Sequence, residues 1–175
     1  MDNTRDDDAM SDPITLRPAT RDDVPVVLQF IRDLARYERL EHEVSACESE
    51  LAEALFGERR HAEVVLACSE GVPVGFALFF HNFSTFKGRP GIYLEDLYVR
   101  PEARGRGIGK LLLAHLAKTA VERRCARLEW AVLDWNAPSI GFYRSLGAVP
   151  MDEWTVFRLT GDALALLGGQ APVQR

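Results

Sequence analysis

The sequence predicts an α/β domain with a mixed sheet, because segments of helical spacing alternate with β-rich segments and two of the latter form a hairpin. The chain has 175 residues, of which 47% are hydrophobic and 27% charged, the size and balance of one ordinary globular domain. Residues 1–12 contain five aspartates and almost nothing to bury, so we expect a mobile acidic tail there. Residues 13–175 are then expected to form a single domain.

Two helices are expected in the first third of the chain. The strand-like segment "ITLRPAT" (14–20) leads into a helix over residues 20–40, in which apolar residues recur at helical spacing. Ser45 and Glu48 have the spacing of a capping box, which predicts that a second helix starts there. Gly57 is expected to end that helix.

The middle of the chain is rich in valine and phenylalanine and predicts strands. The segments "AEVVLACS" and "PVGFALFFHNF" flank the turn-like "EGVP", so residues 62–83 are expected to form a hairpin. Asn136 is the expected cap of a later, short helix. The remaining elements are expected as strands over 92–99, 126–134 and 154–159 and helices over 107–123 and 136–147.

Charge and cysteine content narrow the class of protein. The net charge of −5 argues against nucleic-acid binding, which normally needs a basic face. No apolar run is long enough for a membrane span or a signal peptide, so we expect a cytoplasmic protein without a membrane partner. Cys47, Cys68 and Cys125 are odd in number and far apart, which favours reduced, buried thiols over disulfides. The four histidines lack ligand spacing, and we expect no metal.

The stretch "RPEARGRGIGK" (100–110) follows an expected strand and opens an expected helix, where unpaired amides and the helix dipole favour an anion. It is not a P-loop, because Arg104 and Leu111 stand where that motif needs a glycine and a Ser or Thr. The G-x-G-x-x-G dinucleotide fingerprint also fails, since no third glycine has the right spacing. What remains is R-x-x-G-x-G, from Arg104 to Gly109.

This hexapeptide resembles the acyl-CoA pyrophosphate loop of the GNAT superfamily of N-acyltransferases. The resemblance runs from Ile14 to about Leu167 and narrows to the diamine acetyltransferase group, which includes polyamine and thialysine N-acetyltransferases. The stretches that carry it are "LRPAT", "LARYERLE", "YLEDLYVRPEARGRGIG" and "LDWNAPSIGFYRSLGA". It implies a mixed, mostly antiparallel sheet of six or seven strands flanked by about four helices. Two central strands, 92–99 and 126–134, would splay apart to admit the pantetheine arm of acetyl-CoA.

The resemblance also implies which residues bind acetyl-CoA. Backbone groups of the first splayed strand would pair with pantetheine, amides of the glycine-rich loop would bind the pyrophosphate, and the short helix would add further contacts. This set is Leu97, Tyr98, Val99, Arg104, Gly105, Arg106, Gly107, Ile108, Gly109, Lys110, Asn136, Ser139 and Tyr143.

Acetyl transfer to an amine needs a base for the nucleophile, stabilisation of the developing oxyanion and an acid for the leaving thiolate. Glu95, in the L-E-D motif, matches the substrate-side glutamate of the family and is the expected base. Its neighbour Asp96 should point to the opposite face of the strand, unless a bulge intervenes. Tyr143, in "GFYRSLG", matches the family tyrosine that lies near the thioester sulfur, and we expect it to protonate the thiolate.

The acceptor is expected to be a small primary amine. Tyr37, Glu38, Glu95 and Asp96 match family positions at the amine site, where aromatic and acidic groups suit an ammonium. The loop "NFSTFKGRPG" (82–91) carries cations where polyamine-acetylating relatives have an acid, and it resembles the loop of thialysine-acetylating members. This favours a lysine- or thialysine-like amino acid over spermidine.

The two cations of this loop are Lys87 and Arg89, which could attract the carboxylate of such an acceptor or simply face solvent on a mobile loop. A homodimer is implied by the resemblance alone. The alternatives are a protein lysine or N-terminal acetyltransferase, and a CoA-binding module without turnover.

Overall fold

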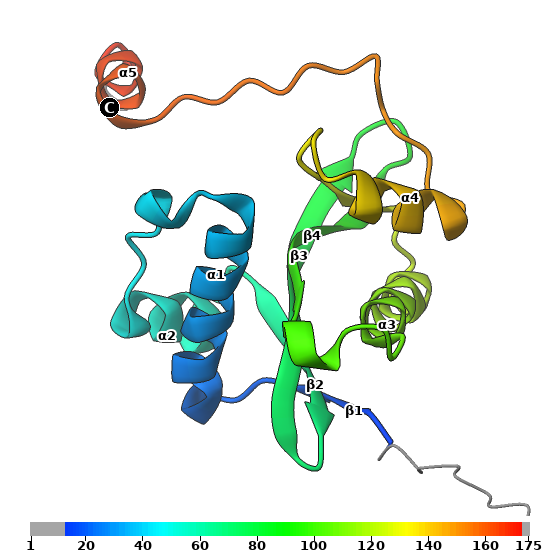
Figure 1. The fold of residues 1–175 in the computed structure, drawn as a ribbon. Coiled ribbons are helices and arrows are strands. Elements are labelled where there is room, and N and C mark those ends of the chain that lie inside the picture. The colour runs from blue at the N-terminus through cyan, green and yellow to red at the C-terminus, as the bar shows by residue number, and fades with distance from the viewer. Residues whose placement is uncertain (1–12, 173–175) are drawn as a thin grey trace, which may run out of the picture. The chain divides into compact units, whose positions relative to one another are not determined.

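The computed structural model describes residues 13–172, which divide between Leu133 and Asp134 into two units. Figure 1 shows the course of the chain. The acidic segment 1–12, which we predicted to be mobile, lies outside the described residues, and the single domain over 13–175 stays a prediction. Among the described residues, no helix has the length and apolar character needed to cross a bilayer.

The first unit is built on one mixed sheet of five strands in the order β1-β2-β3-β4-β5. Neighbours from β1 to β4 are antiparallel, whereas β4 and β5 run parallel. Helices α1 and α2 cover one face of this sheet and α3 covers the other (Figure 1). The elements of the unit are β1 Thr15–Pro18, α1 Val24–Glu38, α2 Glu48–Phe56, β2 Glu63–Ser69, β3 Val72–Ser84, β4 Arg89–Val99, α3 Ile108–Glu122 and β5 Leu128–Trp130.

The predicted mixed, mostly antiparallel sheet is confirmed, but the predicted number of elements is wrong. The described residues contain five strands rather than six or seven, and five α-helices rather than about four. The hairpin predicted over residues 62–83 is present as β2 and β3, with its turn at positive-φ Glu70 and Gly71.

Helix α1 starts close to the predicted cap. Asp23 accepts hydrogen bonds from the amide and hydroxyl of Thr20 at 2.8 and 2.9 Å, and a short 3-10 turn over Arg21–Asp23 leads into the helix. The buried face of α1 rests on the sheet through Phe30, whose ring stacks on Phe76 of β3 at 5.5 Å. This aromatic contact anchors the helix that carries two of the predicted acceptor residues at its last turn.

The cap of α2 lies slightly later in the chain than predicted. The capping box is formed by Cys47 and Glu50, not by Ser45 and Glu48, and the Cys47 amide donates to Glu50 Oε2 at 3.2 Å. Cys47 is exposed, so the expectation of a buried thiol is wrong there, whereas Cys68 is buried as predicted and Cys125 is only partly buried. Helix α2 ends at Gly57, as expected.

Strand β5 is much shorter than the predicted strand over 126–134. It pairs with β4 only from Ile92 to Leu94, opposite Leu128 to Trp130. The side chain of Asn82 in β3 stabilises this short pairing, because its Nδ2 donates a hydrogen bond to Glu129 Oε2 at 2.7 Å.

The second unit holds helices α4, Ala137–Ser145, and α5, Gly161–Gly168. The strand predicted over residues 154–159 is wrong: the segment has no regular secondary structure, and α5 follows it where no helix was predicted. The backbone N–H and C=O groups of a strand need a neighbouring strand as their hydrogen-bond partner. The described residues of this unit offer no other strand, so the β-rich composition of the segment alone does not make one.

The bond between Asn82 and Glu129 requires a glycine at residue 91. Gly91 lies opposite Asn82 in the β3–β4 pair, and a Cβ built there would overlap Asn82 Oδ1 and approach Arg127 Cγ to 3.1 Å. We expect Gly91→Ala to lower the free energy of unfolding by about 1–3 kcal/mol, the usual cost of overpacking. Urea denaturation measures it. In an Asn82→Ala background the same change should cost less, and an equal cost in both backgrounds would contradict this packing account.

Candidate functional site

A β-bulge in β4 shapes the site. Leu94 pairs with Phe79 and Asp96 pairs with Leu78, so Glu95 is the extra residue on the bulged strand. A bulge breaks the simple alternation of side chains along a strand. The bulge is the exception attached to the expectation that Glu95 and Asp96 point to opposite faces, so simple alternation no longer predicts their directions.

Past the bulge, one side of β4 is left without a strand partner. Pairing with β5 ends at Leu94, while β4 continues to Val99; we call residues 95–99 the open edge. The amide of Arg100 donates to Val74 O at 2.9 Å and so faces β3. Because backbone groups alternate in direction along a strand, those of Leu97 and Val99 face away from β3, and those of Tyr98 face toward it.

The open edge fits an extended chain with amide groups. Pantetheine carries amides, so the backbone of Leu97 and the amide of Val99 can hold it as an added strand would be held. The carbonyl of Val99 already accepts a hydrogen bond from Arg104 Nε. The backbone of Tyr98 is directed at Phe76 of β3 and is not part of that surface. The early end of β5 is what opens this side of β4. The predicted splaying of strands 92–99 and 126–134 stays a prediction.

Beside the open edge, the charges of Glu38 and Glu95 act on the carboxyl group of Asp96; we call these three residues the acid cluster. Glu38 is the last residue of α1, and the other two lie in the bulge of β4. Burial raises the pKa of Asp96 to about 6, and the charges of Glu95 and Glu38 contribute to the rise. Burial also raises the pKa of Glu38. The structure thus brings the predicted Glu38, Glu95 and Asp96 together.

The glycine-rich loop ends in a helix N-terminus suited to an anion. Gly105 and Gly107 have φ of 79° and 75°, and Gly107 is the N-cap of α3. The amide of Leu111 donates to Gly107 O at 3.0 Å, which is the first bond of the helix. The preceding amides of Ile108, Gly109 and Lys110 have no carbonyl of their own helix to pair with. They fit the pyrophosphate of CoA.

The two arginines of this loop contact protein groups. The Arg104 amide donates to Pro101 O at 3.2 Å, and its Nε donates to Val99 O at 3.0 Å. Its guanidinium lies over the ring of Tyr37, a residue of the acceptor set, at 5.2 Å. Arg106 Nη1 donates to Ser69 Oγ at 3.2 Å. Sequence reasoning missed the contact between Arg104 and Tyr37, because the two residues come from distant segments and no local pattern links them.

Lys87 and Arg89 do not join the acid cluster of the same chain. Arg89 begins β4 six residues before Glu95, and Lys87 lies in the turn beyond it. At about 3.3 Å per residue, the backbone of Arg89 is about 20 Å from that of Glu95.

The remaining predicted residues belong to the second unit. Asn136 caps α4, because its Oδ1 accepts a hydrogen bond from the Ser139 amide at 3.3 Å. Its side chain is buried. Tyr143 lies on α4, half-buried, with its ring 5.4 Å from that of Phe142. The predicted roles of Asn136, Ser139 and Tyr143 toward acetyl-CoA stay predictions.

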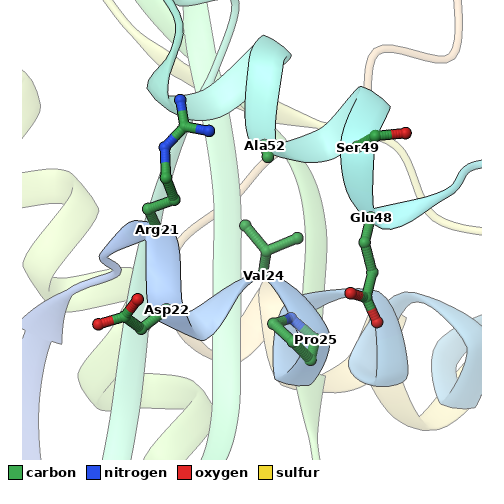
Figure 2. A pocket seen from close by; sticks show the side chains of 7 residues that line it. All are labelled: Arg21, Asp22, Val24, Pro25, Glu48, Ser49 and Ala52. Carbon is green, nitrogen blue, oxygen red and sulfur yellow. The ribbon is translucent and has the colours of Figure 1, made fainter.

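A separate pocket lies at the opposite end of α1 from Glu38 (Figure 2). Helix α1 has 15 residues, so its two ends are about 22 Å apart. The pocket is bordered by Arg21 on one side and by acidic side chains on others, and it lies outside the acid cluster and the glycine-rich loop. Its lining residues are Arg21, Asp22, Val24, Pro25, Glu48, Ser49 and Ala52.

Comparison with protein families identifies the family of a chain with these features. The family described as "Acetyltransferase (GNAT) family" matches residues 28–148. This chain belongs to the GNAT family. As a GNAT acetyltransferase it is an acetyl-CoA-dependent N-acetyltransferase, with acetyl-CoA as the acetyl donor.

Individual relatives span nearly the whole chain. The GNAT chain is 38% identical over 168 residues to thialysine N-epsilon-acetyltransferase of Bos taurus, covering 90% of this chain and 98% of the relative. It is 34% identical to an L-ornithine N5-acetyltransferase of Arabidopsis thaliana, with 85% of each chain covered. A spermidine/spermine N(1)-acetyltransferase-like protein of Homo sapiens is 29% identical over 87% of this chain and 23% of that protein.

Solved structures share the fold. An integron cassette protein from the mobile metagenome of V. cholerae has a TM-score of 0.75 at 29% identity, covering 91% of this chain and 98% of that one. An aminoglycoside acetyltransferase from an uncultured soil metagenomic sample, in complex with sisomicin, has a TM-score of 0.72 at 19% identity, covering 85% and 97%. The mixed α/β fold of the GNAT family is therefore present.

The geometry of the glycine-rich loop predicts the effect of a side chain at Gly107. A Cβ there would meet no atom within 4 Å, but φ of +75° is a conformation that β-branched residues avoid. We expect Gly107→Val to weaken CoA binding about tenfold, since forcing the left-handed conformation costs about 1–2 kcal/mol. Calorimetry measures it, with Arg106→Ala as the control that should have a smaller effect. Unchanged CoA affinity in folded Gly107→Val protein would remove the loop from the phosphate site.

Proposed function

We propose that this GNAT acetyltransferase acetylates the side-chain amine of a small lysine-like amino acid, such as thialysine, lysine or ornithine. The observation that carries the proposal is the acid cluster of Glu38, Glu95 and Asp96 beside the open edge, because it attracts an ammonium group to the side of β4 where the donor fits. The relatives named for thialysine and ornithine N-acetylation support the same acceptor class.

In the proposed reaction the neutral amine attacks the thioester carbonyl carbon directly. A C–N bond forms, the C–S bond breaks, the amine proton leaves to a carboxylate, and the CoA thiolate takes a proton from an acid. We assign the carboxylate step to Asp96 with the help of Glu95, and the acid step to the Tyr143 hydroxyl. Tyr143 suits that step because the ordinary pKa of tyrosine, near 10, is only slightly above that of a thiol.

The raised pKa suits Asp96 to the role of base. An alkylamine has a pKa near 10.4, so proton transfer to an ordinary aspartate near 3.9 is strongly uphill. With the pKa of Asp96 at about 6, the transfer is easier by about 3 kcal/mol. The carboxylate nonetheless stays ionised at neutral pH, ready to accept the proton. Glu95 is exposed and can guide the incoming ammonium toward it.

Lys87 and Arg89 fit the proposal only through a second copy of the chain. The backbone of Arg89 lies about 20 Å along β4 from that of Glu95, and Lys87 lies in the turn beyond it. A lysine-like acceptor with its amine at Asp96 extends far less than that. We therefore propose a cytoplasmic homodimer in which the β3–β4 turn of one chain supplies these cations to the acceptor carboxylate bound by the other.

The acceptor class is tested by measuring kcat/KM for thialysine, lysine, ornithine, putrescine and spermidine at low and high salt. We expect higher kcat/KM for the amino acids than for putrescine and spermidine. The ratio should fall at high salt and in Lys87→Glu, because an exposed charge pair is worth about 1 kcal/mol at 4 Å in water. Lys118→Glu is the matched control: it makes the same charge change on α3, beside Glu122, and should leave the preference intact. A preference for spermidine would overturn the proposed acceptor, and acetylation of peptides alone would indicate a protein acetyltransferase.

The raised pKa of Asp96 also predicts pH effects on activity and stability. In the wild type, kcat/KM should contain a rise centred near pH 6 as Asp96 ionises, and Asp96→Asn should lose this rise together with most of the activity. Because the pKa of Asp96 is higher in the folded than in the unfolded protein, ionised Asp96 lowers the free energy of unfolding. This loss is absent below about pH 4, grows between about pH 4 and 6 and is complete above about pH 6.

At pH 7.5, Asp96→Asn should therefore be more stable than the wild type by up to about 3 kcal/mol, and the difference should shrink toward pH 4. Urea denaturation at several pH values measures this. Glu58→Gln is the control, because Glu58 is exposed and does not belong to the acid cluster. A rise near pH 6 that persists in Asp96→Asn would assign the base elsewhere.

A further inference from the structure

Arg104 occupies the point where three parts of the site meet. It belongs to the loop that precedes α3, its Nε donates to Val99 O at 3.0 Å, and its guanidinium lies over two aromatic rings. The ring centroids of Tyr37 and Tyr98 are 5.2 and 5.8 Å from the guanidinium carbon. Val99 is the last residue of the open edge, and Tyr37 is in the last turn of α1.

The two tyrosines differ in how firmly the rest of the protein holds them. Tyr98 is buried, and its ring lies 5.9 Å from that of Phe30 in the core. Tyr37 is 39% exposed and stands at the end of its helix, directly before Glu38 of the acid cluster. Arg104 thus bridges a fixed ring and a more exposed one.

The contacts of Arg104 limit its role as a phosphate ligand. Its amide is already bonded to Pro101 O, and its Nε to Val99 O. The amides of Ile108, Gly109 and Lys110 are the ones that the start of α3 leaves for an anion. The side chain of Arg104 is directed instead to the aromatic side of the acceptor site.

We propose that Arg104 is a positioning residue that joins the CoA-binding loop to the acceptor wall by stacking on Tyr37, an inference that rests on the proposed acceptor site. Through Tyr37 it holds the last turn of α1, and with it Glu38, against the end of β4. Ordering of the loop by CoA then also orders the acceptor wall. By thermodynamic linkage, loosening Tyr37 must weaken CoA binding in return.

An arginine suits this position better than a lysine. Its planar guanidinium stacks on an aromatic face while Nε donates in the plane, whereas an ammonium group has no such face. Arg104→Lys should therefore behave like Arg104→Gln, although it keeps the charge that a direct phosphate contact would use. This separates positioning from simple attraction of the phosphate.

The test is a double-mutant cycle on the dissociation constant of CoA, measured by calorimetry without any amine. We expect Tyr37→Leu to raise the constant about two- to fivefold, the range that an exposed cation–π contact provides. In an Arg104→Gln background, Tyr37→Leu should have little further effect. Arg106 is the matched control: it lies in the same loop but bonds to Ser69, so Tyr37→Leu should keep its full effect in Arg106→Gln.

Two further variants keep the test decisive if one protein folds poorly. Tyr37→Phe keeps the ring and should keep most of the affinity, whereas Tyr37→Leu should not. Arg104→Lys should lose the coupling to Tyr37 as Arg104→Gln does. Melting temperatures of all variants report on folding separately.

Three results would each overturn the proposal. In the first, folded Tyr37→Leu protein keeps the CoA affinity of the wild type. In the second, Tyr37→Leu weakens CoA binding by the same factor in the Arg104→Gln background as in the wild type. In the third, Arg104→Lys behaves like the wild type.

The cycle does not depend on the identity of the acceptor. If no amine in the panel were acetylated, the proposed acceptor class would fail while the coupling of Arg104 to Tyr37 could still be measured with CoA alone. If the amines were acetylated and the cycle were additive, the function would stand and the positioning role of Arg104 would be wrong.

Discussion

The β-bulge at Glu95 is the constraint on which the site depends. It inserts one residue into β4 between Leu94 and Asp96, at the point where pairing with β5 ends. After it, the backbone of Leu97 and Val99 faces the side without a strand, where an extended donor fits. The same insertion brings Asp96 under the influence of both Glu95 and Glu38. In the proposed site, one local irregularity therefore sets the place of the donor and that of the acids.

Burial gives Asp96 a pKa that suits the role of a base. An exposed carboxylate would attract the ammonium of an acceptor but would be a poor base for it, because its pKa is too low. Partial burial beside two like charges raises the pKa of Asp96 to about 6. The protein keeps this acid at a cost in stability at neutral pH, as is common for acids tuned for proton transfer.

The glycine-rich loop serves the site through conformation and through a side chain. Gly105 and Gly107 adopt positive φ, which directs the amides at the start of α3 outward. Arg104, at the front of the same motif, is turned toward Tyr37 and Val99. The two parts of the motif thus serve different sides of the site: its glycines belong to the expected phosphate site, and its first arginine contacts α1. The proposed coupling between the donor site and the acceptor site runs through this loop for that reason.

The sequence by itself determined the features that depend on neighbouring residues, and the tertiary structure decided those that depend on distant partners. The cap of α4 at Asn136, the end of α2 at Gly57 and the β2–β3 hairpin follow from local chemistry, and the structure has all three. The R-x-x-G-x-G motif and the other stretches that resemble the GNAT superfamily likewise predicted the family, which the match over residues 28–148 confirms. Residues 154–159 are β-rich, yet a strand forms only beside another strand.

The bulge at Glu95 depends on the register between β3 and β4, which the sequence of β4 alone does not determine. The pKa of Asp96 and the contact of Arg104 with Tyr37 are likewise set by packing. Burial, electric fields and stacking depend on which segments the fold brings together, and no local pattern encodes them.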